Sequence, residues 1–288
     1  MTEDEWLTCT NIDEMLVNLP STASSRKLTL FGCACCRRLW PLLVDGSRRS
    51  VEAAEQGADG LIARGKMQAA WEEAEEALES VWRNWHNVSI ELLANREAAE
   101  AARRAVEAVI NSDEETFDFL FHVEFMAQFS RDALAYFAAK DLAQVIDPPQ
   151  QVVEQTETFH HREDTAGSTG EYYQLLTSER ILVKNQDAQI IRSAWLDEMH
   201  RQCSLFREVF GNPFQPVTVD EKWLTWSGNT VVNLAQAIYE ERAFERLPIL
   251  ADALEEAGCT DADILNHCRQ PGQHVLGCWP VDLLLGKK

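Results

Sequence analysis

Apolar side chains recur every three or four positions along most of this chain, the spacing of helices that bury one face. Thr10 or Asn11 is placed to cap a short helix within residues 6–19. The next predicted helix covers about residues 26–43, and Pro41 is expected to fray its end. The apolar stripe of that helix consists of Leu28, Phe31, Cys35, Leu39 and Leu42.

The middle of the chain predicts a helical hairpin, followed by a long apolar helix. The alanine- and glutamate-rich segment 94–109 forms the second arm of the hairpin. Ser112 and Glu115 have the spacing of a capping box, which opens a helix predicted over residues 113–146. The stripe of the first arm consists of Trp71, Ala74, Leu78, Trp82 and Trp85.

The last part of the chain is again helical in its pattern, after an irregular stretch. Residues 150–170 are polar and end in small residues, which predicts an irregular connection. Residues 180–183 fit either a short strand or the start of a helix, and residues 280–285 a short apolar turn. Further helices are expected over residues 186–210, 230–241, 243–257 and 261–267.

These elements predict an all-α fold, a multi-helix bundle with its N- and C-terminal segments packed together. We expect an N-terminal helical region over residues 1–146 and a linker or irregular segment over residues 147–185. A C-terminal helical region over residues 186–288 is expected to pack on residues 1–45, so that the chain forms one composite domain.

The chain is strongly acidic, with 47 Asp and Glu against 26 Lys and Arg among 288 residues, and a net charge of −21. Such a field repels polyanions, so nucleic acid is not an expected partner. The basic group Arg26, Lys27, Arg37 and Arg38 is interpreted as a solvated helix face. The first residues are acidic and no long apolar run follows, so we expect no membrane span and a cytoplasmic protein with reduced thiols.

The cysteines gather near the two ends of the chain, which predicts that the ends meet and that their thiols share one neighbourhood. Thiolate and imidazole donors favour zinc. The alternative is that these cysteines pack as small apolar side chains between helices. The spacing does not match a zinc ribbon, whose ligands come in pairs two residues apart. The expected ligands are Cys33, Cys36, Cys259, Cys268, His274 and Cys278.

A thiol enzyme is a further alternative. Cys36 is the candidate nucleophile because Arg37 beside it would favour the thiolate, and His267 or His274 is the candidate base. The common phosphate-binding, zinc-protease, esterase and EF-hand motifs are absent from the sequence. The glutamate-rich run 72–79 contains no Glu-x-x-His, which argues against a di-iron site in the bundle.

Several short motifs lie near the two ends of the chain: Cys33-Ala34-Cys35-Cys36-Arg37-Arg38, Gly211-Asn212-Pro213-Phe214, the segment Leu250 to Cys259, Asn266-His267-Cys268-Arg269 and Gly277-Cys278-Trp279. They resemble a planctomycete-type family without an assigned activity. The match covers roughly the first 45 and the last 80 residues. The resemblance implies that the two ends belong to one unit, and it implies no mechanism.

The favoured interpretation is a non-enzymatic interaction or adaptor protein whose partner is another protein. A long helical surface, nine tryptophans and the lack of a catalytic motif support it. The alternative is a metal-binding protein with zinc as its ion, or a thiol-dependent enzyme, using cysteines from both ends.

Overall fold

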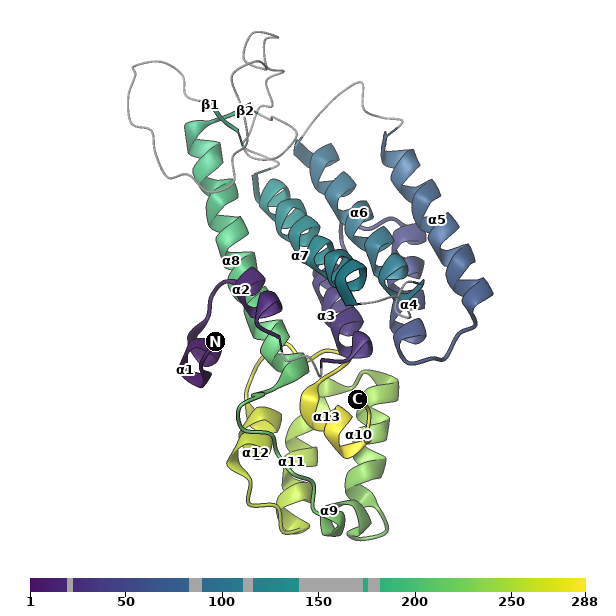
Figure 1. Cartoon of the computed structure of the whole chain (residues 1–288), viewed down its shortest axis with the longest axis vertical. Coiled ribbons are helices and arrows are strands. Elements are labelled where there is room, and N and C mark those ends of the chain that lie inside the picture. The colour runs from purple at the N-terminus through teal and green to yellow at the C-terminus, as the bar shows by residue number, and fades with distance from the viewer. Residues whose placement is uncertain (20–22, 83–89, 111–115, 140–172, 176–181) are drawn as a thin grey trace.

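Helices make up most of the described chain. A computed structural model describes residues 1–19, 23–82, 90–110, 116–139, 173–175 and 182–288. The helices form two parts, a main bundle of α1–α8 and a C-terminal unit of residues 211–288 below it (Figure 1). The prediction of an all-α multi-helix bundle with packed terminal segments is confirmed.

The main bundle contains α1 (Glu3–Thr8), α2 (Ile12–Val17), α3 (Ser25–Arg38), α4 (Asp45–Ala58), α5 (Arg64–Trp82), α6 (Ile90–Ile110), α7 (Thr116–Ala139) and α8 (Asn185–Phe210). The C-terminal unit contains α9 (Glu221–Thr225), α10 (Thr230–Glu241), the 3-10 helix η2 (Phe244–Arg246), α11 (Leu247–Glu256), α12 (Ala262–Arg269) and α13 (Trp279–Leu284). Two short strands, β1 (Tyr173–Leu175) and β2 (Leu182–Lys184), pair antiparallel before α8.

The core of the main bundle surrounds α3, in which every residue from Leu28 to Cys36 is buried. Gly32 allows α7 to approach closely, since a Cβ there would lie 2.3 Å from Cε of Met126. The alanines of α6 fill the space beside α7. The predicted hairpin corresponds to α5 and α6, which pack on each other. The expected cap at residues 112–115 and the segment 140–172 lie outside the described residues.

The C-terminal unit has a hydrophobic core of its own, formed by α9–α13. Residues 280–285 were expected as a turn, but residues 279–284 form helix α13. Pro280 is compatible with that helix because it occupies the first turn, where a backbone N–H has no intrahelical partner. The cores divide near Gly211 and not at residue 186, because α8 packs within the main bundle.

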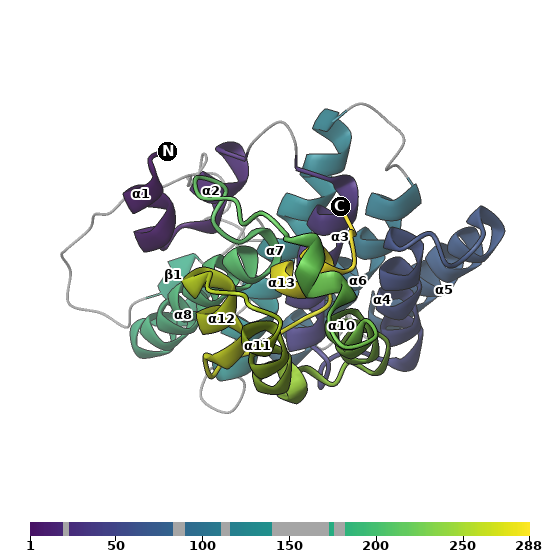
Figure 2. The same cartoon turned by 90° about the horizontal axis from the view of Figure 1, so that it is seen from below.

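Contacts between the two ends of the sequence join the parts. Arg26 at the start of α3 binds Asp282 of α13 at 2.7 Å, and the last residues lie beside α3 (Figure 2). The indole N–H of Trp6 donates to the carbonyl of Gly211 at 3.1 Å. Within the described ranges, no helix is long and apolar enough to cross a membrane.

Candidate metal centre

Four side chains with metal-binding atoms meet where the main bundle joins the C-terminal unit. Glu208 lies in the last turn of α8, and His267 lies on α12. His274 and Cys278 belong to the segment between α12 and α13, where Cys278 is the residue before α13. One donor atom from each residue lies within 4.8 Å of the others, and Glu208, His267 and Cys278 are buried. This group can hold a metal ion.

The carboxylate of Glu208 is the centre of the group. Its Oε2 lies 3.0 Å from Nε2 of His267, and its Oε1 lies 3.0 Å from Nδ1 of His274. The sulfur of Cys278 lies 3.5 Å from Nε2 of His267. Each imidazole therefore turns one nitrogen toward the same carboxylate, and that of His267 also faces the thiol.

The surroundings of His267 determine its tautomer. The indole N–H of Trp279 lies 2.9 Å from Nδ1 of His267, and an indole nitrogen can only donate. Nδ1 is therefore the acceptor, and the proton of the neutral ring is on Nε2, facing Glu208. The indole of Trp279 packs closely against Gly211, where a Cβ would lie 3.1 Å from the ring. Gly211 also has a φ of +66°, which favours glycine.

The charges of the group are balanced within it. Burial alone would raise the pKa of Glu208, but hydrogen bonds from His267 and His274 lower it overall. Burial alone would lower the pKa of His274, but its hydrogen bond and attraction to Glu208 raise it overall. Burial and the nearby Glu208 charge raise the pKa of Cys278 well above its usual value. Without a metal, the group is thus a carboxylate with imidazole and thiol donors around it.

The metal-free chain is expected to be most stabilised by this pair between pH 4.5 and 6.5. The raised pKa of His274 contributes stability below its usual value of 6.5, which is lost as the pH rises through the folded value. The lowered pKa of Glu208 contributes stability above 4.5, which is lost on acidification. Urea unfolding in EDTA should show that His274→Asn removes on the order of 1 kcal/mol of stability at pH 6 and less at pH 9. An equal loss at both pH values would contradict the charged pair.

Two of the residues expected as ligands, His274 and Cys278, belong to the group. Cys259 and Cys268 are buried in the core of the C-terminal unit, but they do not belong to the donor group. Cys33 and Cys36 lie in the core of the main bundle. The donor group thus contains a cysteine from the C-terminal end but neither Cys33 nor Cys36, and a site shared by the thiols of both ends stays a prediction. Contacts between the ends run along the whole of α3. Arg26 binds Asp282 at its start, a Cβ on Gly277 would lie 3.2 Å from Leu30, and Arg38 at its end donates to Gln273 at 3.0 Å.

Cys36 does not have the surroundings expected of a nucleophile. Its side chain is fully buried, and burial together with the charge of Glu55 raises its pKa to about 12. Arg37 opposes this rise only in part, because its guanidinium binds Glu55 at 2.7 Å. The thiol is thus protonated at neutral pH and packs as a small apolar side chain.

Sequence reasoning missed Glu208 as a ligand and considered His267 only as a base. Glu208 is one of 47 acidic residues and lies about sixty positions before the other donors, so no spacing marks it. The sequence does contain a signal for His267, because two histidines and a cysteine lie close together between residues 267 and 278, a spacing typical of metal ligands.

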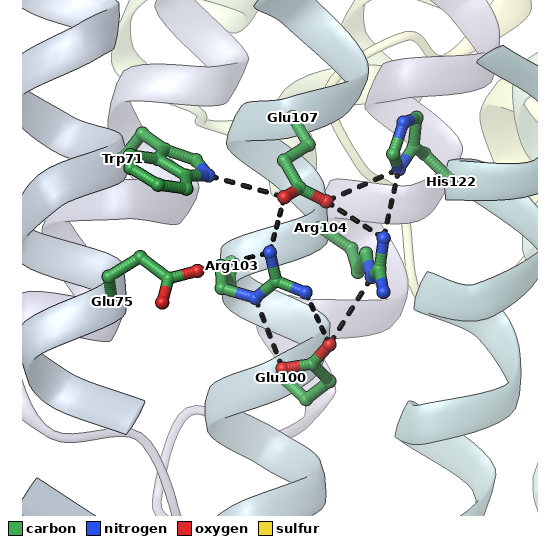
Figure 3. Close-up of polar contacts among 7 residues, drawn as sticks. All are labelled: Trp71, Glu75, Glu100, Arg103, Arg104, Glu107 and His122. Carbon is green, nitrogen blue, oxygen red and sulfur yellow. Dashed lines mark hydrogen bonds and ion pairs between the residues drawn. The ribbon is translucent and has the colours of Figure 1, made fainter. Parts of the chain in front are cut away.

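A second group of charged side chains, most of them half-buried, lies between α5, α6 and α7 (Figure 3). Burial alone would raise the pKa of Glu107, but a hydrogen bond from His122 and the nearby arginines lower it to about 2. Arg103 binds Glu100 at 2.5 Å, and the guanidinium groups lie between the carboxylates, where a bundle metal would need to be. This group is an ion-pair network of Trp71, Glu75, Glu100, Arg103, Arg104, Glu107 and His122.

Comparison of the chain with family models, with curated proteins and with solved structures finds no match. The family resemblance of the two ends therefore stays a prediction. The chemistry of the site has to be argued from its own donors.

Proposed function

We propose that this protein binds one zinc ion through Glu208, His267, His274 and Cys278, and that the ion joins α8 to the C-terminal unit. The observation that carries the proposal is the convergence of one carboxylate, two imidazoles and one thiol within 4.8 Å. Zinc accepts nitrogen, sulfur and oxygen donors together, and four protein ligands suit its tetrahedral sites. Calcium and magnesium require oxygen ligands and do not fit this set.

The charge of a zinc complex suits the burial of these residues. A divalent ion with one carboxylate and one thiolate is neutral, and the two imidazoles bind as neutral ligands. A neutral centre avoids the cost of leaving a net charge in a buried place. Four protein ligands leave no open position for substrate, which favours a structural role over a catalytic one.

Loading the ion requires protons to leave. Cys278 releases its thiol proton, and His274 releases a proton from Nδ1 where the ring is charged, so zinc affinity should rise with pH. In the loaded site His267 binds through Nε2 and carries its proton on Nδ1. That nitrogen can then no longer accept the hydrogen bond that Trp279 donates in the metal-free chain. The amide of Gln270, 3.4 Å from Nδ1, can turn over to present its oxygen to that proton. Zinc binding therefore breaks the hydrogen bond from the indole. The donors already lie close together before the ion binds.

Zinc titration of the full chain tests the proposal. Protein stripped with EDTA should remain folded, because the donors bind one another without the ion. It should then take up one zinc per chain, and at free zinc 100 times the Kd it should gain about 2.7 kcal/mol of stability. Competition with a chromophoric chelator gives the affinity, and thermal melting gives the gain. Failure to take up zinc in a saturable way would rule out the proposed function.

The interaction role expected from the sequence stays a prediction. Several large apolar side chains are exposed on the described surface, but no observation selects a partner. A metal that fixes the C-terminal unit is compatible with such a role, since the unit would then present a rigid surface.

A further inference from the structure

A pocket of about 280 Å³ opens at the junction of α1, α3, the end of α8 and the last residues of the chain. Part of its wall is apolar, and the rest is basic. The size is at the small end of the range of small-molecule sites, so a compact ligand fits it better than a nucleotide. The wall includes Trp6, Phe210 and Pro213 on the apolar side, and Lys27, Lys287 and Lys288 on the basic side.

The concentration of lysine here is unusual for this chain. The sequence has a net charge of −21 and contains only seven lysines. Three of the seven line this pocket, and among the residues that the structure describes no Asp or Glu lines it. The pocket is thus a local positive region on an otherwise strongly negative protein, where an anion is attracted.

Lys27 is the lysine with spare binding capacity. Its Nζ donates to the carbonyl of Val209 at 2.9 Å and lies 5.9 Å from the ring centre of Phe210. An ammonium group has three N–H donors, so two remain. Among the described residues, no carboxylate lies within 4.0 Å of this nitrogen, and burial lowers the pKa of Lys27. Charged groups that are largely buried are normally paired, so an anion would complete this site.

The other basic residues differ from Lys27. Lys287 already lies 3.3 Å from Asp59 and 4.2 Å from the ring centre of Tyr239. Ser24, which also lines the pocket, caps the first turn of α3, so the positive end of this fourteen-residue helix is beside it. These features add to the positive potential, while Lys27 supplies the direct contact.

We propose that this pocket binds a small organic anion, a carboxylate attached to an apolar or aromatic body. The carboxylate binds Lys27, and the body packs against Trp6, Phe210 and Pro213. Both parts contribute, because the wall is too apolar for an inorganic ion and too basic for a neutral hydrocarbon. The site does not depend on the metal centre, whose four ligands lie outside the pocket lining.

Calorimetric titration of the zinc-saturated full chain with phenylacetate tests this proposal. Saturable binding of one phenylacetate is expected, and phenylacetamide, of the same shape but neutral, should bind at least about tenfold more weakly. Lys27→Met keeps the apolar stem and removes the charge, and it should weaken phenylacetate binding by a similar factor. Lys66→Met, at an exposed lysine on α5, is the matched control and should bind as the unaltered chain does.

Three results would overturn the proposal. They are no saturable binding of phenylacetate, equal binding of the acid and the amide, and unaltered binding by a folded Lys27→Met chain. The comparison of acid and amide uses only the unaltered chain, so it decides the question even if Lys27→Met does not fold.

Discussion

Cys278→Ala is expected to lower the zinc affinity of the chain by more than about 100-fold. Removing a residue that only hydrogen-bonds to a metal ligand costs up to about 100-fold, and removing a ligand itself should cost more. The thiolate is the single sulfur donor in the group, and its negative charge is needed to make the complex neutral. The loss should appear as a higher Kd in chelator competition and as a smaller thermal gain with zinc.

Cys268→Ala is the matched control for this prediction. Both cysteines are buried in the core of the C-terminal unit, each with 1% of its surface exposed, so both substitutions remove similar buried volume. Cys268 lies outside the donor group, and its replacement should leave zinc affinity within about threefold, a difference of less than 1 kcal/mol. Equal losses in the two variants would show that the effect comes from packing and not from ligation.

Arg26→Met is expected to destabilise the protein by about 3–5 kcal/mol, the cost of breaking a buried ion pair by removing one partner. The guanidinium binds both oxygens of Asp282, at 2.7 and 3.0 Å, and its Nε binds Asp59 at 2.7 Å. Asp282 is fully buried, so its charge has no access to water when the arginine is gone. Tyr239 also loses its hydrogen bond from this arginine.

Arg49→Met provides the comparison, because Arg49 pairs with Glu73 on the surface with 59% of its side chain exposed. Removing that pair should change stability by no more than about 1 kcal/mol. Denaturant unfolding of both variants measures the difference. If Arg26→Met lost no more stability than Arg49→Met, the contact between α3 and α13 would not be what holds the two ends together.

Local structure could be predicted where the responsible groups lie close together in the sequence. The cap at Asn11 is an example, since its side chain accepts from the N–H of Asp13. Helix α10 covers residues 230–241 as the apolar spacing predicts. The error at residues 280–285 has a local cause as well. Proline in the interior of a helix ends it, but proline in the first turn is compatible with the start of a helix.

The site could be predicted only in part, because Glu208 lies on a helix far in the sequence from the other three ligands. His274 and Cys278 were identifiable as donors near the end of the chain. Glu208 was not, since its role depends on where α8 ends relative to α12. Cys33 and Cys36 share a spacing suitable for chelation, but that face of α3 is turned into the main core. The packing of the helices, and not the spacing of donors along one helix, therefore decides which donors meet.

In the proposed site, one sulfur and three nitrogen or oxygen atoms bind a single zinc ion at the junction of the two parts. X-ray absorption at the zinc edge of the loaded chain measures that shell directly. The expected result is one sulfur at about 2.3 Å and three lighter donors at about 2.0–2.2 Å, with the sulfur lost in Cys278→Ala. A shell without sulfur, or one with two or more sulfurs, would contradict the proposed ligands.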